Sequence, residues 1–128
     1  MENLIILIVC LLAGISTYHI SCTLGKGPVV ASAVVTLLSG LIFPFLFPTI
    51  GGVLAAAGAC ASYTGMVDIQ KVCSLKEMAV VSLITGLIFI IATSAYSGIG
   101  GRLGTISAIA CFVWIGIKIL FSKYKSAL

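Results

Sequence analysis

Four hydroxyl side chains occupy matching places in two nearly identical stretches of this chain. Residues 33–43 read Ala-Val-Val-Thr-Leu-Leu-Ser-Gly-Leu-Ile-Phe, and residues 79–89 read Ala-Val-Val-Ser-Leu-Ile-Thr-Gly-Leu-Ile-Phe, with eight of 11 positions identical. The paired hydroxyls are Thr36, Ser39, Ser82 and Thr85. Within each copy they are three residues apart, so they share one face of a helix. A glycine follows each pair (Gly40 and Gly86) and permits close approach of another backbone.

Hydroxyl oxygens inside a membrane can replace the water around a cation or a small polar solute. If the two helices that carry these hydroxyls face each other, the four side chains converge on one site within the membrane. Small and hydroxylated residues also line plain helix–helix contacts in lipid. The sequence leaves both interpretations open: a substrate-binding site and a packing surface.

Three ionisable residues add candidate chemistry. Arg102 follows a glycine-rich stretch, and we expect it at the outer mouth of the membrane domain, where it would bind an anionic substrate or simply occupy a turn. His19 lies near the inner end of the first apolar run and is a candidate proton relay, because histidine exchanges protons near neutral pH. Asp68 lies at the inner end of the third run, where it forms either an ion relay or an interfacial ion pair with Lys71.

No arrangement of residues predicts an enzyme. The five cysteines contain no C-x-x-C pair, and the chain has no zinc-protease, phosphate-loop or serine-elbow motif. The seven basic residues are scattered, so the net charge of +4 does not indicate a nucleic-acid partner. We therefore predict no catalytic residues, no metal and no cofactor.

The composition predicts a membrane protein. Hydrophobic residues make up 61% of the chain and charged residues 8%, whereas soluble domains carry roughly 25% charged residues. So few charges cannot cover a surface in water, and the lipid bilayer is the expected surrounding. With 128 residues, the chain is predicted to form a single transmembrane domain over 1–128.

Five apolar runs are long enough to cross a bilayer, which takes about 20 residues. They cover residues 3–22, 28–48, 51–68, 77–97 and 102–121. Pro44 and Pro48 must bend or end the second run, and four spans are the alternative, because little separates the second run from the third. With the N-terminus outside, six basic residues fall on the cytoplasmic side and only Arg102 outside, the usual bias of inserted proteins. The predicted location is the plasma or inner membrane, with the C-terminus cytoplasmic.

The runs also form a repeat. Cysteines recur at intervals of 50 and 51 residues in the odd-numbered runs, at Cys10, Cys60 and Cys111. The prediction is two helical hairpins, about 3–50 and 51–101, followed by an extra helix at about 102–121. Corresponding helices are two crossings apart and point the same way, which makes the repeats parallel. The expected fold class is all-α integral membrane.

The third run consists of small residues, and 55–62 read Ala-Ala-Ala-Gly-Ala-Cys-Ala-Ser. Such a helix packs closely against neighbours, so we predict it at the centre of the bundle or at a seam of self-association around Gly58 and Ser62. Duplicated polar patches and helix breaks favour a small homo-oligomeric transporter or channel for an ion or small polar solute. The alternative is a non-catalytic accessory subunit that binds a partner protein in the membrane.

Overall fold

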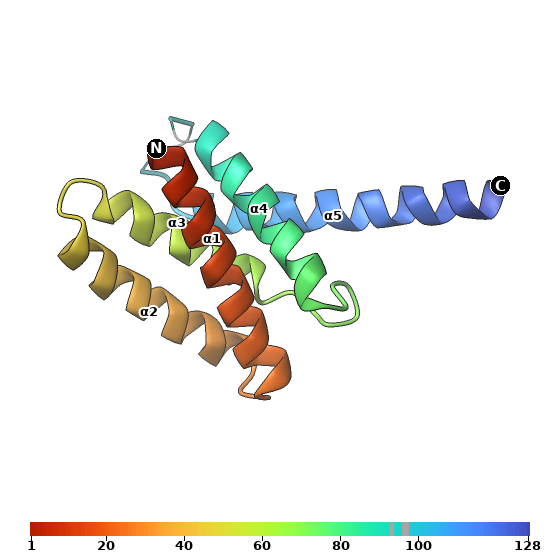
Figure 1. The fold of residues 1–128 in the computed structure, drawn as a ribbon, viewed down its shortest axis with the longest axis horizontal. Coiled ribbons are helices and arrows are strands. Elements are labelled where there is room, and N and C mark those ends of the chain that lie inside the picture. Colours follow the sequence, from red (N-terminus) through yellow and green to blue (C-terminus); the bar gives the residue numbers. More distant parts are fainter. Residues whose placement is uncertain (93, 96–97) are drawn as a thin grey trace.

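The computed structural model describes residues 1–92, 94–95 and 98–128, and these residues form helices and no strand. The first helix, α1 (Glu2–Tyr18), continues into a π-helical turn, η1 (His19–Thr23). The other helices are α2 (Pro28–Leu46), α3 (Gly51–Thr64), α4 (Leu75–Ile91) and α5 (Arg102–Ala127). Figure 1 shows all of them as one bundle. The all-α prediction is confirmed, and each of the five predicted runs carries a helix.

The helices differ in length from the predicted runs. α3 ends four residues before the predicted end at 68, and the predicted end of the fourth run falls partly on residues 93 and 96–97, which lie outside the described residues. Within the described residues, three helices are long and apolar enough to cross a membrane: Glu2–Thr23, Pro28–Leu46 and Arg102–Ala127. α3 and α4 have 14 and 17 residues. They are therefore about 21 and 25 Å long, shorter than a hydrocarbon core of about 30 Å.

α2 begins and ends at residues that constrain the backbone. Gly27 precedes the helix with a φ of 89°, a conformation that residues with a side chain disfavour. Pro28 occupies the first helical turn, where no N–H is needed. Pro44 lies inside the helix, which ends two residues later, and Pro48 follows that end. The predicted break at the two prolines is confirmed.

α4 begins at a side-chain cap. Ser74 Oγ accepts a hydrogen bond from the backbone N–H of Glu77 at 3.2 Å. The Glu77 carboxylate reaches back and accepts from the backbone N–H of Cys73 at 3.3 Å. This reciprocal arrangement resembles the capping box of Ser-x-x-Glu sequences. It fixes the start of α4 at Leu75, two residues before the predicted start at 77.

α3 lies at the centre of the bundle. It packs against α1, α2, α4 and α5, whereas α2 and α4 pack on α1 and α3 rather than on each other. In Figure 1, α1 runs between α2 and α4. The predicted central place of the small-residue helix is confirmed, because small side chains allow several neighbours to approach one helix closely.

The turn between α2 and α3 brings the backbones of the two helices into contact. The Gly51 N–H donates to the Phe47 carbonyl at 2.7 Å. A Cβ added to Gly51 would lie 2.5 Å from the Phe43 carbonyl oxygen and 2.5 Å from Pro44 Cα. A side chain does not fit there, so the packing of this hairpin depends on glycine.

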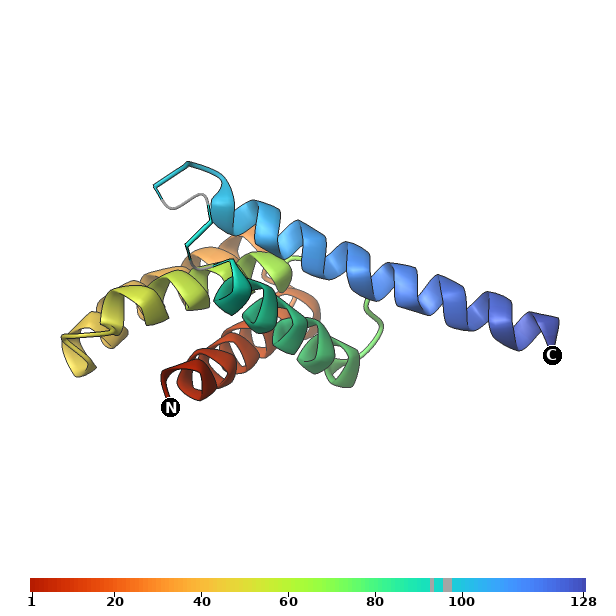
Figure 2. The ribbon, with the colours of Figure 1, turned by 90° about the horizontal axis from the view of Figure 1, so that it is seen from above.

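α5 packs on the bundle mainly with its first half, and in its second half Lys118 contacts Glu77 and Lys71. Ile106, Ser107 and Ala110 are its buried residues, and Figure 2 shows the rest of the helix projecting beyond the other helices. The exposed apolar side chains of this second half include Ile119, Leu120 and Phe121. In a membrane, this half of α5 contacts lipid or a helix of another chain.

Candidate functional site

A row of hydroxyls runs along α2 where it packs on α3. Ser32, Thr36 and Ser39 are four and three residues apart, which puts them on one helix face. Ser62 of α3 lies opposite, with its Oγ 3.1 Å from Ser32 Oγ and 2.9 Å from Thr36 Oγ1. Ser62 is 0% exposed and Ser32 is 5% exposed, so protein encloses this cluster. We call these four residues the hydroxyl seam: Ser32, Thr36, Ser39 and Ser62.

One backbone carbonyl orients the protons of the seam. Ser62 donates its hydroxyl proton to the Ala59 carbonyl at 2.7 Å. A hydroxyl has one proton and two lone pairs, so Ser32 and Thr36 donate to Ser62 Oγ. Their own oxygens keep lone pairs that can accept. Ser32 and Thr36 therefore present acceptors, which suit a cation or a hydrogen-bond donor better than an anion.

A cavity of about 500 Å³ lies near the start of α2, and none of the seam residues lines it. It lies between η1 and the turn after α3, and its lining includes Ser21, Cys22, Pro28, Met66 and Asp68. Pro28 is the lining residue of α2 and precedes Ser32 by one turn of that helix. Asp68 contributes an exposed carboxylate, which accepts the backbone N–H of Gln70 at 3.0 Å. This cavity thus carries an acidic group.

A second groove meets the same row from the side of α1. Its volume is about 340 Å³, and the side chains that line it are apolar apart from Ser16 and Ser39. Ser39 also faces α3, because a Cβ added to Gly58 would lie 2.6 Å from Ser39 Oγ. Ser39 therefore places one end of the hydroxyl seam at an apolar groove, and Ser32 at the other end lies one helical turn from Pro28, which lines the polar cavity.

The two hydroxyls of α4 do not join the seam, so the predicted convergence of four hydroxyls is wrong. Thr85 Oγ1 lies 3.0 Å from Thr64 Oγ1 of α3. Ser82 is 0% exposed, faces Gly14 of α1, and its Oγ has no hydrogen-bond partner among the described residues. α2 and α4 pack on α1 and α3 rather than on each other, and the duplicated hydroxyls consequently face different neighbours.

The two repeat glycines also differ. A Cβ added to Gly86 would lie 2.8 Å from Leu7 Cδ2 and 3.4 Å from Cys10 Cβ, whereas a Cβ on Gly40 would have nothing within 4 Å. The predicted close approach is confirmed at Gly86 and wrong at Gly40. The reason is that Gly40 lies on the exposed face of α2.

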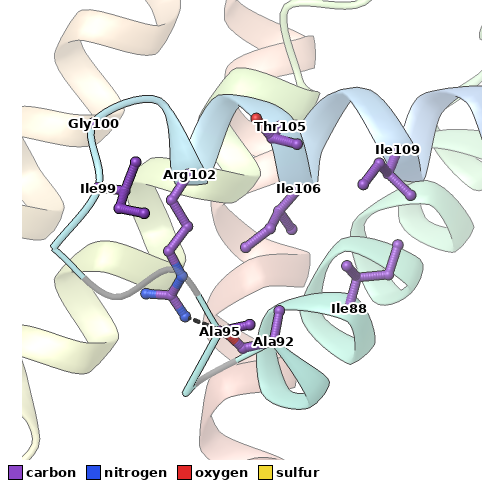
Figure 3. Close-up of a pocket in the computed structure, with 9 residues that line it drawn as sticks. All are labelled: Ile88, Ala92, Ala95, Ile99, Gly100, Arg102, Thr105, Ile106 and Ile109. Carbon is purple, nitrogen blue, oxygen red and sulfur yellow. Dashed lines mark hydrogen bonds between the residues drawn. The ribbon is translucent and has the colours of Figure 1, made fainter.

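Arg102, which we expected to share the substrate site, lies elsewhere. It is the first residue of α5, and its Nη2 donates to the Ala92 carbonyl at 2.7 Å. The guanidinium carbon lies 5.5 Å from the centroid of the Phe89 ring. Figure 3 shows Arg102 in a separate cavity of about 290 Å³ between α4 and α5. None of the seam residues lines that cavity.

The predicted relay residues, His19 and Asp68, are both exposed. His19 is the first residue of η1, and π-helical turns are frequent at functional sites. The predicted ion pair of Asp68 with Lys71 is wrong, because in the described part of the chain the ion pair joins Lys118 to Glu77 at 3.0 Å. Lys118 Nζ also donates to the Lys71 carbonyl at 3.1 Å.

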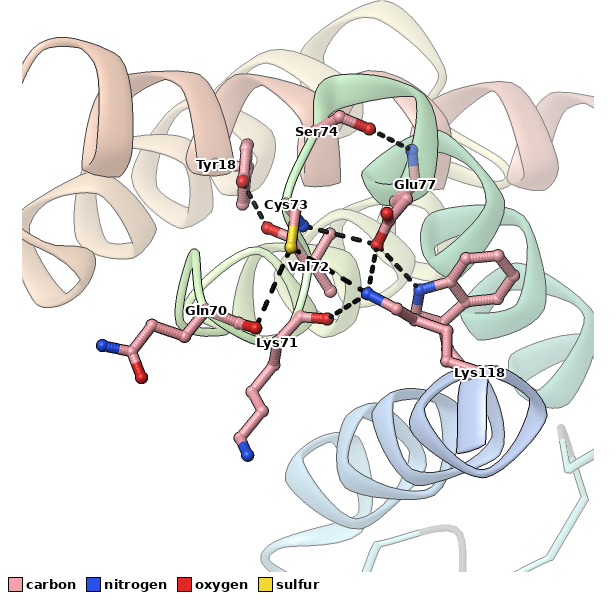
Figure 4. A network of polar contacts seen from close by, with 9 residues as sticks. Tyr18, Gln70, Lys71, Val72, Cys73, Ser74, Glu77 and Lys118 are labelled. Carbon is pink, nitrogen blue, oxygen red and sulfur yellow. Dashed lines mark hydrogen bonds and ion pairs between the residues drawn. The ribbon is translucent and has the colours of Figure 1, made fainter. Parts of the chain in front are cut away.

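Glu77 connects α4 to α5 in a polar network (Figure 4). Its Oε2 accepts from Lys118 Nζ at 3.0 Å and from Trp114 Nε1 at 3.3 Å. Close by, the Tyr18 hydroxyl donates to the Val72 carbonyl. These contacts tie α1, α4 and α5 together at one end of the bundle. Sequence reasoning missed them, although the capping-box pattern that positions Glu77 was readable.

Sequence reasoning also missed Ser32 and assigned Ser62 a different role. Ser32 aligns with Met78 in the second repeat, so a search for duplicated hydroxyls passes over it. Its spacing from Thr36 was the signal that could have found it. Gly58 and Ser62 are buried against α2 of the same chain. The predicted face for self-association is therefore occupied within one molecule.

The described residues offer little to a metal ion. No three His, Cys, Asp or Glu side chains gather there in a group that could hold one. The five cysteines are free thiols, and Cys10 and Cys60 lie in the core, where they donate to the carbonyls of Ala57 and Leu103.

Comparison of the chain with protein-family models, curated proteins and solved structures finds no match. The functional argument therefore rests on the chemistry of the site.

Proposed function

We propose that this protein carries a cation or a small polar solute across a membrane along the hydroxyl seam. The observation that supports the proposal is the cluster of Ser32, Thr36 and Ser62, which is buried except at Thr36 and presents oxygen acceptors one helical turn from a cavity that contains a carboxylate. Oxygen acceptors at membrane depth can replace a hydration shell. An anion would meet acceptors and a negative charge there, so the proposed substrate is cationic or neutral.

The proposed architecture has five membrane crossings, with the N-terminus outside and the C-terminus cytoplasmic. Two contacts support the parallel repeat. Cys10 Sγ donates to the Ala57 carbonyl, and Cys60 Sγ lies 3.5 Å from Ser107 Oγ, each across 47 positions of sequence. Both partners of the first contact shift by 50 residues to give the second, so each odd-numbered helix meets the next one in the same register.

We also propose that the active unit is a homo-oligomer. The five helices of one chain are few to enclose a transport pathway through a bilayer. Thr36 is only partly buried, and the groove between α1 and α2 is lined by Leu12, Leu38 and other apolar side chains that are partly exposed. A second chain against this side would complete the wall of the pathway.

Purified protein reconstituted alone in liposomes is expected to raise the flux of at least one of H⁺, Na⁺, K⁺ or a neutral solute such as urea above that of protein-free liposomes. Ion-sensitive dyes and stopped-flow light scattering measure these fluxes. Chloride flux should stay at background, because the seam presents acceptors. Background flux for every probe would contradict a self-sufficient transporter, and chloride flux alone would contradict an acceptor-lined pathway.

A second candidate function is that of a non-catalytic subunit in a larger membrane complex. The observation that favours it is the second half of α5, whose apolar side chains project past the rest of the bundle. A helix that leaves its own bundle is well placed to pack on the helices of another protein.

Native mass spectrometry of the particle, extracted from its own membrane in mild detergent, separates the two functions. A subunit is expected to co-purify with a second polypeptide in fixed proportion, and Leu120→Ser should release that polypeptide. Leu37→Ser is the matched control, since Leu37 is 63% exposed on α2 and Leu120 is 68% exposed. A particle that contains copies of this chain alone would count against the subunit and favour transport.

A further inference from the structure

The cavity between α4 and α5 has a charged end and an apolar end (Figure 3). Arg102 lies beside Ala92 at the charged end. Isoleucines line the other end, Ile88 from α4 and Ile106 and Ile109 from α5. A ligand with an anionic group and an apolar chain would match both ends of this cavity of about 290 Å³.

Contacts with Phe89 of α4 and with Ala92, the residue after that helix, help to hold the guanidinium in place. Arg102 Nη2 donates to the Ala92 carbonyl at 2.7 Å. The guanidinium carbon lies 5.5 Å from the centroid of the Phe89 ring, within the range of a cation–π contact. A guanidinium has five N–H groups in a planar fork that matches the oxygens of a phosphate. Because the side chain is already ordered, binding a phosphate would require little further loss of its conformational freedom.

The place of Arg102 on α5 sets the depth of the cavity in a bilayer. Arg102 is the first residue of a helix that is long and apolar enough to cross a membrane, and a charged side chain at such an end lies at the level of the headgroups. Ile109 follows about 10 Å farther along the helix. Ile99 and Ile109 are 59% and 44% exposed, so the cavity is open to the lipid beside the protein.

We infer that this cavity binds an anionic phospholipid, with the phosphate on Arg102 and the first part of one acyl chain along Ile88, Ile106 and Ile109. The charge of the guanidinium complements the phosphate, and bidentate arginine–phosphate pairs are among the stronger hydrogen bonds. The isoleucines complement the chain. This lipid site is independent of the hydroxyl seam, and it applies to a transporter and to a subunit alike.

Titration of the purified full chain with phosphatidylglycerol and with phosphatidylcholine of the same acyl chains, followed by native mass spectrometry, tests the lipid site. Phosphatidylglycerol is expected to bind about tenfold more tightly, the size of effect that a charge-assisted hydrogen bond gives. Arg102→Gln should remove this preference. Lys123→Gln should keep it, because it deletes one exposed charge near the other end of α5. A preference that survives in Arg102→Gln overturns the lipid site.

Two further measurements cover the remaining outcomes. Ile109→Trp fills the apolar end of the cavity without changing the charge, and it keeps the test decisive if Arg102→Gln does not fold. It should weaken phosphatidylglycerol binding to a similar degree, and unchanged affinity would overturn the assignment. Inorganic phosphate should neither bind nor compete at the concentrations at which the lipid binds. Equal binding of inorganic phosphate would mean that the cavity takes a free anion and would overturn the lipid as its ligand.

Discussion

Replacing Gly51 by alanine is expected to lower the free energy of unfolding by about 2 kcal/mol, the usual cost of overpacking a filled contact. The added Cβ would lie 2.5 Å from the Phe43 carbonyl oxygen and 2.5 Å from Pro44 Cα. Both are backbone atoms of α2, so no side chain can rotate away and the hairpin must open. Thermal unfolding in mild detergent, followed by the fluorescence of Trp114, the single tryptophan, would measure the loss.

Gly52 supplies the matched control. A Cβ there has nothing within 4 Å, and alanine is more stable than glycine in a helix by about 0.5–1 kcal/mol. Gly52→Ala should therefore leave the unfolding temperature unchanged or raise it. Equal unfolding temperatures for the two variants would contradict the close contact between the backbones of α2 and α3.

Ser62→Ala is expected to reduce the flux of the reconstituted protein about tenfold, the equivalent of one lost hydrogen bond in the rate-limiting barrier. Ser62 is the acceptor for both Ser32 and Thr36, so the substitution disrupts the whole cluster with little change in volume. Flux of the most permeant probe, measured in liposomes with equal amounts of folded protein, would show the effect.

Ser82→Ala is the control for that experiment. Ser82 is also 0% exposed but faces α1, away from the seam, so its loss should leave flux unchanged. Ser62→Ala is expected to unfold at a lower temperature, because Ser32 and Thr36 lose their shared partner, and Trp114 fluorescence should show that it is still folded at the temperature of the flux assay. If Ser82→Ala lost flux and Ser62→Ala did not, the pathway would lie along α4. Normal flux in both variants would contradict the proposal that the substrate moves along the hydroxyl seam.

The helices could be predicted from the sequence because apolar length and backbone constraints act locally. Pro28 and Pro44 define the ends of α2 through their own geometry, and the small residues of α3 predicted its central place. The end of α3 could not be predicted from hydropathy. α3 ends at its C-cap Gly65, where glycine is a local signal for a helix end, and a Cβ there would lie 2.7 Å from Thr17 Cβ and 2.8 Å from the Gly14 carbonyl oxygen.

The neighbours of each helix could not be predicted, and the site depends on them. The repeat equates Ser39 with Thr85, yet Ser39 faces Gly58 and Thr85 faces Thr64. α2 packs on α1 and α3, while α4 packs on α1, α3 and α5. Two nearly identical stretches therefore meet different surfaces, because contacts between helices join residues far apart in the chain and a local match cannot specify them.

The short central helix also has an electrical consequence. α3 has 14 residues and is about 21 Å long, so on the proposed pathway beside this helix the distance between the two aqueous sides would be shorter than the thickness of the bilayer. Water in the polar cavity near Asp68 would shorten this distance further, and the membrane voltage would then fall mainly across the hydroxyl seam. One elementary charge that crosses 100 mV gains about 2.3 kcal/mol. A cation that follows the proposed pathway would release most of this electrostatic free energy as it moves from Ser32 to Ser39, over about 10 Å.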